Sequence, residues 1–219
     1  MRILALDAAL ARCSAAVLDN GIVLAHAAAP GGRGQATSLA PMAAHALEQA
    51  GFAATALDGI AVTVGPGSFA GLRTALSLAH GIALAAGCPV VGVRVAEALA
   101  ETIAVPPGRA LWVAIDSRRG RVFLDRDGAI AAFALTDLPR PAGPIALAGD
   151  ASNDVAARLA ARGANVMLTG AVLPDAIAVA QVGARRLSGA LSPLAAQPLY
   201  IDPPEAKLPA GGLRPPPRL

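Results

Sequence analysis

The sequence predicts an α/β protein made of two similar halves, each built around a mixed β-sheet, with the second half reduced. Two observations lead to this prediction: apolar segments of strand length precede segments with helical spacing, and the opening pattern recurs after residue 106. The 219 residues are 55% hydrophobic but only 3% aromatic. Alanine, valine and leucine must therefore pack the core.

Three strands are predicted at the start of the chain. An apolar run at residues 3–6 ends at Asp7, and two further runs cover residues 14–18 and 22–27. The segment Asp19-Asn20-Gly21 joins these two runs, and Asn-Gly supplies the positive φ angles of a two-residue hairpin turn. The first two connections are therefore expected to be antiparallel.

Two helices and two strands complete the first half. A glycine-rich loop at residues 30–34 precedes a helix that ends near Ala50 and Gly51, with Pro41 in its first turn or at a kink. The later elements are a strand, a sharp turn, a helix and a strand at residues 59–64, 65–67, 68–86 and 90–93. Antiparallel strands followed by parallel ones, covered by helices, are typical of the ribonuclease-H-like half of actin-like ATPases.

The second half repeats this opening. Pro106-Pro107-Gly108 predicts a boundary between an N-terminal subdomain, residues 1–105, and a smaller C-terminal subdomain, residues 106–219. The apolar run ending at Asp116 matches the run ending at Asp7, and the turn Arg126-Asp127-Gly128 matches the first hairpin turn. Two duplicated mixed-sheet subdomains, the second reduced, predict the actin-like ATPase fold.

Less regular structure is expected after this second hairpin. A strand near residues 145–148, a short helix near 152–161 and a final helix are predicted. The final helix begins at the N-cap Asp175, carries apolar residues as far as Leu191, and is assigned to the C-terminal subdomain. The proline-rich tail after Tyr200 is expected to be irregular.

Composition narrows the class of protein. A formal charge of +3 permits contact with nucleic acid without requiring it. Cys13 and Cys88 form no CxxC pair and Asp7 interrupts any signal peptide, so a cytoplasmic protein is expected. Residues 74–93 are uncharged and as long as a membrane span, but the turn at Gly87 divides them into a predicted buried helix and strand.

The residues that would carry ATPase chemistry are incomplete. Asp7 and Asp116 stand at the strand ends where aspartates hold hydrated magnesium in actin-like ATPases. The loops after those aspartates need glycine or small hydroxyl residues to wrap phosphates. Asp7 is followed by two alanines and a leucine, and the second loop has no glycine before Gly120. No catalytic residue and no cofactor site are predicted, although an ATPase or sugar kinase remains the alternative.

Two apolar helices side by side predict a contact surface. Small residues recur at every fourth position from Gly71 to Gly87, and such a ridge lets another helix pack closely. Either an element of the chain itself or a partner must cover these helices. The predicted interface combines both helices: Leu39, Met42, Ala43, Ala46, Gly71, Leu72, Ala75, Leu76, Ala79 and Ala83.

Several segments resemble one family. Residues 57–73, with Gly65-Pro66-Gly67-Ser68-Phe69 inside them, and residues 89–93 closely resemble the TsaB family. Residues 114–120 and 198–201 fit the same family in the right order. Ala8 and Gln35 depart from it, because the family usually has a threonine and a histidine at these places.

The resemblance implies a non-catalytic subunit that supports TsaD, which transfers a threonylcarbamoyl group to the tRNA adenosine 3′ of the anticodon. The two helices would form a helical bundle with TsaD, TsaE would join a larger complex, and contact with tRNA would be indirect or weak. A homodimer through the same helices is the other arrangement.

A second alternative, a glycoprotease-like metalloenzyme, would need the histidine pair of TsaD. The matching positions here are Val95 and Leu99, which bind no metal. The histidines present, His26, His45 and His80, fall on separate predicted elements. No metal site is therefore predicted.

Overall fold

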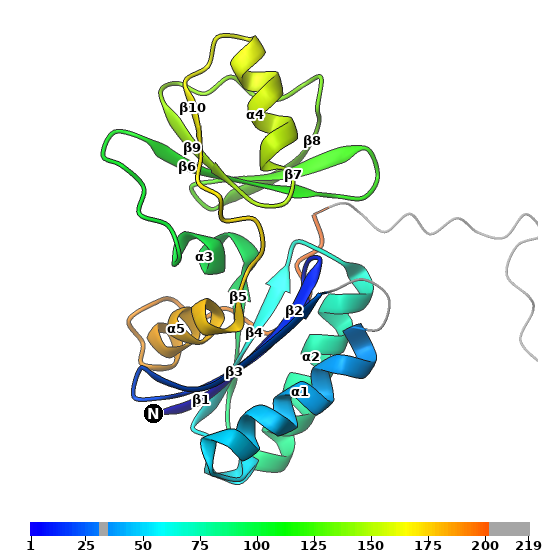
Figure 1. Ribbon diagram of the computed structural model, residues 1–219, viewed down its shortest axis with the longest axis vertical. Helices are drawn as coiled ribbons and strands as arrows, with labels where there is room; N and C mark the ends of the chain where they lie inside the picture. The colour runs from blue at the N-terminus through cyan, green and yellow to red at the C-terminus, as the bar shows by residue number, and fades with distance from the viewer. Residues whose placement is uncertain (31–34, 202–219) are drawn as a thin grey trace, which may run out of the picture.

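A computed structural model describes residues 1–30 and 35–201 as two sheets with helices around them (Figure 1). Residues 31–34 of the predicted loop, the side chain of Gln35 and the tail from residue 202 lie outside the described residues, whereas Pro30 ends the third strand. The elements in order are β1 (Arg2–Asp7), β2 (Arg12–Asp19), β3 (Ile22–Pro30), α1 (Gln35–Ala50), η1 (Ala54–Ala56), β4 (Gly59–Gly65), α2 (Phe69–Ala86), β5 (Val90–Arg94), α3 (Val95–Ala100), β6 (Ala110–Asp116), β7 (Arg121–Arg126), β8 (Ala129–Ala134), β9 (Ile145–Ala148), α4 (Ser152–Ala161), β10 (Val166–Leu168) and α5 (Ala176–Leu187).

The two sheets have the same topology. The first has the strand order β3-β2-β1-β4-β5, and the second, read from its other edge, has the order β8-β7-β6-β9-β10. In each sheet the first three strands pair antiparallel, and the fourth strand lies parallel to the first. The predicted duplication and the predicted fold class are both confirmed.

Matching hairpin turns support the duplication. Asn20 and Gly21 join β2 to β3 with φ angles of 49° and 82°, and Asp127 and Gly128 join β7 to β8 with φ angles of 53° and 85°. Both pairs have the two positive φ angles of a two-residue hairpin, as the sequence predicts. Asn and Asp tolerate this left-handed conformation better than other non-glycine residues.

Helices cover both faces of the first sheet. Leu4, Leu6 and Val62 pack into the core beneath α1 and α2, while the neighbouring Ala5 and Ala61 pack against α5 on the other face. Alternate residues of a strand point to opposite faces, so these apolar strands are buried on both sides.

The final helix was assigned to the wrong half by the sequence. Asp175 accepts a hydrogen bond from the Ile177 N–H at 3.0 Å and caps α5 as predicted, but the helix ends at Leu187 and packs on β1, β2 and β4 of the first sheet. Gly183 permits the close approach, because a Cβ there would lie 2.3 Å from Ala61 Cβ. The division at residue 105 remains a prediction.

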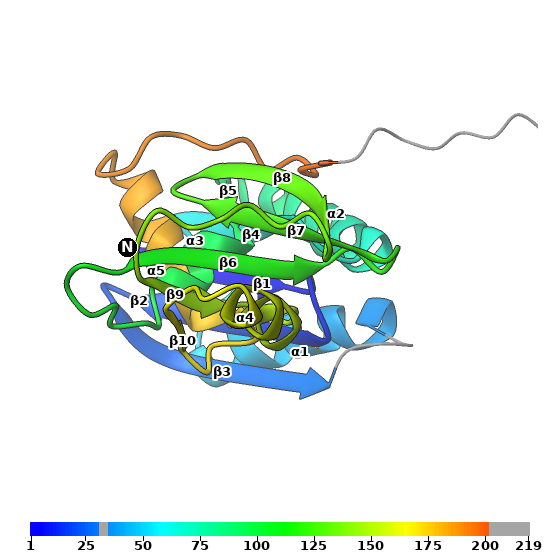
Figure 2. The ribbon, with the colours of Figure 1, turned by 90° about the horizontal axis from the view of Figure 1, so that it is seen from above.

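The second sheet is less fully covered. Helix α4 packs on one face, over the side that carries Trp112 and Leu147. Val113 and Ile115, from the other face of β6, join the core of the first half. Figure 1 shows the second sheet and α4 above the first sheet, and Figure 2 shows them in front of it. The two halves therefore share part of one hydrophobic core.

Three short elements differ from the predictions, and the position of Pro41 is narrowed to one of two alternatives. The sequence patterns do not predict α3, which has six residues, or η1 and β10, which have three each, because segments this short show no clear periodicity. Pro41 lies inside α1, so the first turn, one of the two positions predicted for it, is excluded. It cannot donate the hydrogen bond that an interior helical residue normally makes to the residue four positions earlier.

Candidate functional site: the paired helices and the strand ends

Helices α1 and α2 lie side by side on one face of the first sheet (Figure 1). The hydroxyl of Ser68 accepts a hydrogen bond from the Gly71 N–H at 3.2 Å and caps α2, and Gly87 ends it with a φ of 69°. The predicted start and stop of α2 are therefore confirmed. By length and composition alone α2 is long and apolar enough to cross a membrane, but its inner side belongs to the core.

The predicted interface residues are mostly part of this core. Nine of the ten are buried and only Met42 is half-buried, so the assignment of these side chains to a surface is wrong. Ala75 and Ala79 have no exposed surface. The ridge of small residues does allow close packing, but against the chain's own sheet and α1. The buried nine are Leu39, Ala43, Ala46, Gly71, Leu72, Ala75, Leu76, Ala79 and Ala83.

A different row of α2 faces outward. Phe69, Arg73, Ser77, His80 and Leu84 recur at intervals of three or four residues and are all exposed; we call them the outer row. Leu84 is 87% exposed and Phe69 is 56% exposed. Exposed large apolar side chains on one helix face mark a surface that can bind another protein.

The N-terminal end of the outer row is an aromatic and cationic cluster. The Arg73 guanidinium carbon lies 3.5 Å from the centroid of the Phe69 ring, and the Phe69 and Tyr200 ring centroids are 6.1 Å apart. Arg73 also donates a hydrogen bond to the Tyr200 hydroxyl at 3.3 Å. Aromatic residues and arginine are enriched among residues that dominate protein interfaces.

The segment that brings Tyr200 to this cluster runs beside α2. His80 Nε2 donates to the Ala196 carbonyl at 2.9 Å, and the Leu199 N–H donates to the Val64 carbonyl at 2.8 Å. These hydrogen bonds join residues more than a hundred positions apart, and no local sequence pattern predicts them. The match of residues 198–201 to a family pattern was the one available signal.

The carboxylate at the end of β1 is completely buried. Asp7 Oδ1 accepts hydrogen bonds from the Ala9 N–H at 3.1 Å and from the Thr63 hydroxyl at 2.8 Å, while Oδ2 has no partner among the described residues. Burial raises the pKa of Asp7 to about 7, although these hydrogen bonds and the charge of Arg12 act in the opposite direction. The carboxyl group is enclosed by protein on all sides.

The loop after β1 is closed by the turn before α2. The Ser68 N–H donates to the Ala9 carbonyl at 2.7 Å, and a Cβ on Gly67 would lie only 2.2 Å from that oxygen. Ala8 and Ala9 are themselves buried. The N–H groups of Ala9 and Ser68, which would have to donate to a phosphate at this strand end, donate to Asp7 and to the Ala9 carbonyl instead.

Replacing Gly67 with alanine is expected to destabilise the fold by about 3 kcal/mol, because the new Cβ meets backbone that cannot move freely. Urea unfolding measures this change. Gly81→Ala is the matched control: Gly81 is exposed on α2 with open space around it, so alanine should stabilise by about 0.5–1 kcal/mol. Equal stability of Gly67→Ala and the wild type would contradict the close approach.

The second strand-end carboxylate, Asp116, is neutralised by its own loop. The Arg118 guanidinium lies 3.2 Å from Asp116 Oδ2 and 3.2 Å from Asp150 Oδ2. The Arg118 N–H also donates to Asp116 Oδ1 at 2.7 Å. The positive charge of Arg118 therefore neutralises the carboxylates that would attract hydrated magnesium in an ATPase.

The histidines are on separate elements, as predicted. His26 on β3 lies 3.0 Å from Asp175, His45 on α1 lies 3.7 Å from Glu48, and His80 is on α2. Val95 and Leu99, at the positions of the TsaD histidine pair, are buried on α3. In residues 1–30 and 35–201, no three histidine, cysteine or acidic residues form a group that could hold a metal.

Two ribonuclease-H-like halves of matching topology define a protein of the actin-like ATPase class. Residues 27–159 match the family described as "TsaD: tRNA N6-adenosine threonylcarbamoyltransferase". The chain belongs to this TsaB/TsaD family. The resemblance predicted from the segment that ends at Arg73 is confirmed.

Individual relatives agree with this assignment. The chain is 36% identical over 125 residues to the tRNA threonylcarbamoyladenosine biosynthesis protein TsaB of Escherichia coli, covering 56% of this chain and 53% of that protein. It is 40% identical over 94 residues to a tRNA N6-adenosine threonylcarbamoyltransferase of Cereibacter sphaeroides, covering 40% and 26% of the two chains. The alignment with TsaB thus spans about half the length of that relative.

A solved structure covers more of the chain. It is that of a Pseudomonas aeruginosa protein described as uncharacterized, with similarity to peptidase YEAZ. The TM-score is 0.77 and the sequences are 27% identical, over 92% of this chain and 99% of the other. The whole arrangement of both halves is therefore shared.

Proposed function

We propose that this chain is a non-catalytic, cytoplasmic subunit in the biosynthesis of threonylcarbamoyladenosine in tRNA, and that it binds TsaD through the outward faces of α1 and α2. The observation that carries the proposal is the outer row, with Leu84 87% exposed on a helix whose opposite side is buried in the core. TsaE would join the same assembly, and contact with tRNA would be indirect or weak.

The strand ends support a non-catalytic role. The N–H groups of Ala9 and Ser68 already donate to Asp7 and to the Ala9 carbonyl where an ATPase would bind phosphate, and Arg118 pairs with both Asp116 and Asp150. An ATPase or sugar kinase would need these backbone groups open and these carboxylates available for magnesium. The role that fits this geometry is to hold and position a catalytic partner.

The outer row also suits a helical bundle. Ser77 and Gly81 are small and exposed between the larger side chains of Arg73 and Leu84. Small residues between larger ones allow a second helix to approach at short distance. Burial of the exposed apolar area would favour the complex by about 25 cal/mol per Å² before the costs of association.

Replacing Leu84 with glutamate is expected to weaken binding to TsaD roughly 10- to 100-fold, because an exposed apolar contact is lost and a charge is placed in the interface. Copurification and calorimetry with TsaD of the same organism measure this loss. Leu168→Glu is the matched control, since Leu168 is an apolar side chain 48% exposed on β10, away from the helix pair.

Three measurements distinguish the proposed TsaD subunit from an ATPase and from a homodimer. Unchanged TsaD binding by Leu84→Glu would show that the surface is wrong, and magnesium-dependent ATP turnover by the purified chain would show that the non-catalytic role is wrong. Sedimentation of the chain alone tests the homodimer. A dimer that Leu84→Glu dissociates would use the same face as TsaD.

A further inference from the structure

One arginine in the outer row is held in place without a carboxylate partner. Arg73 is the only lysine or arginine in α1 and α2. Its guanidinium stacks on the Phe69 ring and donates to the Tyr200 hydroxyl; we call these three residues the Arg73 cluster. Within residues 1–30 and 35–201, no carboxylate forms an ion pair with Arg73.

A segment of the chain positions Tyr200 beside this arginine. Residues 194–200 cross from the edge strand β5 to the start of α2, and we call them the strap. The Gly92 N–H donates to the Leu194 carbonyl at 2.8 Å, and a Cβ on Gly92 would lie only 2.6 Å from the Ala195 carbonyl oxygen. Together with the two hydrogen bonds described above, this close approach fixes the strap on the first half.

The Arg73 cluster is open to solvent. Phe69 is 56% exposed and Tyr200 is 52% exposed. A guanidinium that stacks through one face still presents N–H donors along its edge, and a carboxylate accepts from that edge through two parallel hydrogen bonds. An arginine that is already held in position loses less side-chain entropy when it binds. The cluster is therefore suited to bind a carboxylate.

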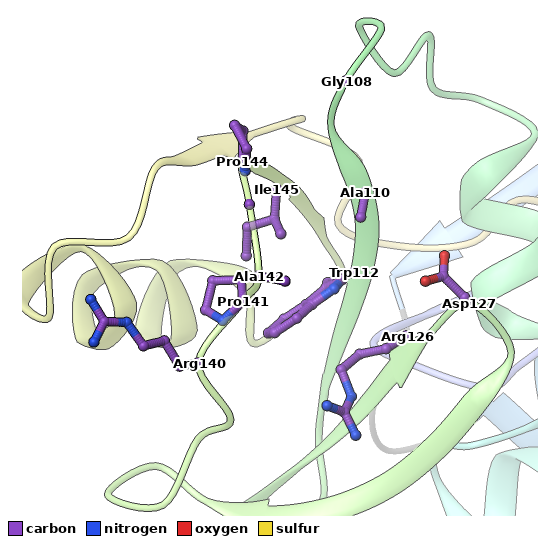
Figure 3. A pocket seen from close by; sticks show the side chains of 11 residues that line it. Gly108, Ala110, Trp112, Arg126, Asp127, Arg140, Pro141, Ala142, Pro144 and Ile145 are labelled. Carbon is purple, nitrogen blue, oxygen red and sulfur yellow. The ribbon is translucent and has the colours of Figure 1, made fainter.

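A pocket of about 400 Å³ on the second sheet also combines arginine with an aromatic ring, but it closes around that ring. The Arg126 guanidinium carbon lies 5.7 Å from the Trp112 ring centroid, and Trp112 is only 6% exposed. Figure 3 shows the Trp112 ring between Pro141 and Arg126, and the side chains of Arg126 and Arg140 pointing in opposite directions. This pocket leaves almost no surface of the Trp112 ring open to a partner, in contrast to the Arg73 cluster.

The surroundings of Arg73 favour a carboxylate of a protein over a phosphate of a nucleic acid. Binding to nucleic acid depends on several lysine or arginine contacts with phosphates, whereas the helix pair has Arg73 alone. The outer row also carries Leu84, which is 87% exposed and requires an apolar partner. At 1.5 Å per residue, Leu84 lies about 16 Å from Arg73 along the helix axis.

We propose that Arg73, positioned by Phe69 and Tyr200, binds a carboxylate on a helix of the partner, and that an apolar side chain of the same helix, about 16 Å away, covers Leu84. The inference rests on the proposed binding of TsaD and states the chemistry that TsaD supplies at this surface. Tyr200 acts as a positioning residue, since it holds the guanidinium that makes the contact.

The test uses the full chain, TsaD of the same organism and calorimetry. Arg73→Met removes the charge and is expected to weaken TsaD binding about tenfold. Arg73→Lys keeps the charge without the planar fork and should weaken it about fivefold. Arg158→Met is the matched control: it removes an equal charge from an exposed position on α4 and should bind TsaD like the wild type. Circular dichroism confirms that each variant is folded.

A double-mutant cycle identifies the carboxylate. Aspartates and glutamates of TsaD are changed one at a time to asparagine or glutamine, and each variant is tested against the wild type and Arg73→Met. One of them is expected to weaken binding to the wild type about tenfold and to cause no further loss with Arg73→Met. In Tyr200→Ala this coupling should fall severalfold, which a purely structural role of Tyr200 would not cause.

The outcomes separate this inference from the proposed function. Unchanged binding by Arg73→Met, together with weaker binding by Leu84→Glu, would overturn the inference and leave the proposed surface intact. Unchanged binding by both variants would overturn both. Losses that add for every carboxylate of TsaD would show that Arg73 pairs with none of them. Weaker binding of tRNA by Arg73→Met, with TsaD binding unchanged, would assign Arg73 to a phosphate instead.

Discussion

Replacing Ala79 with arginine is expected to unfold the first half, with a loss of about 5 kcal/mol in the free energy of unfolding. Ala79 has no exposed surface and lies on the side of α2 that packs into the core. An arginine there would bury a charge without a partner and separate the helix from the sheet. Urea denaturation and the yield of soluble protein measure the effect.

Ser77→Arg is the matched control for this prediction. Ser77 is exposed on the same helix, two residues before Ala79. The same side chain at this position should change stability by less than about 0.5 kcal/mol. Stable, soluble Ala79→Arg would mean that the ridge faces outward, which is one of the two arrangements that the sequence allows, and that the described packing of α2 is wrong.

Asp7 is expected to make the free energy of unfolding depend strongly on pH, which is the second large effect. Its pKa in the folded state is about 7, above the ordinary value of 3.8. Between these values the unfolded chain releases the proton while the folded chain retains it, so the wild type loses stability as the pH rises from about 4 to about 7. The full loss is about 4 kcal/mol and persists above pH 7.

Asp7→Asn should remove this slope. Asparagine keeps an acceptor for Ala9 and Thr63 and carries no charge at any pH, so the variant should match the wild type near pH 4 and exceed its stability at pH 8. Denaturation at a series of pH values measures the difference. Asp137→Asn, at an exposed position, is the control and should follow the wild-type curve. Parallel stability curves for Asp7→Asn and the wild type would contradict the raised pKa of the buried Asp7.

Local chemistry made most of the fold predictable. Asn20-Gly21 and Asp127-Gly128 specify their hairpins by positive φ angles, and Ser68 caps its helix through a short-range hydrogen bond. Such features depend on residues within a few positions of each other. The repeat of an apolar strand ending in aspartate then revealed the second half, although β10 was too short to show a pattern.

The candidate site was predicted at the level of the helix pair and not of its residues. Helix α2 has small or apolar residues around most of its circumference, so periodicity does not distinguish the side that packs on the sheet from the side that faces solvent. The small residues Ala75 and Ala79 turned out to face the sheet, and Leu84 faces solvent.

The amino-acid sequence by itself determined the strands, the turns, the helix ends and the duplication, because these follow from backbone preferences and contacts between near neighbours. Only the tertiary structure decided that α5 returns to the first sheet, that Tyr200 meets Phe69 and Arg73, and that Trp112 and Arg126 line a pocket with the loop before β9. These arrangements join residues far apart in the chain. Their positions depend on how whole layers pack, and no local pattern encodes that.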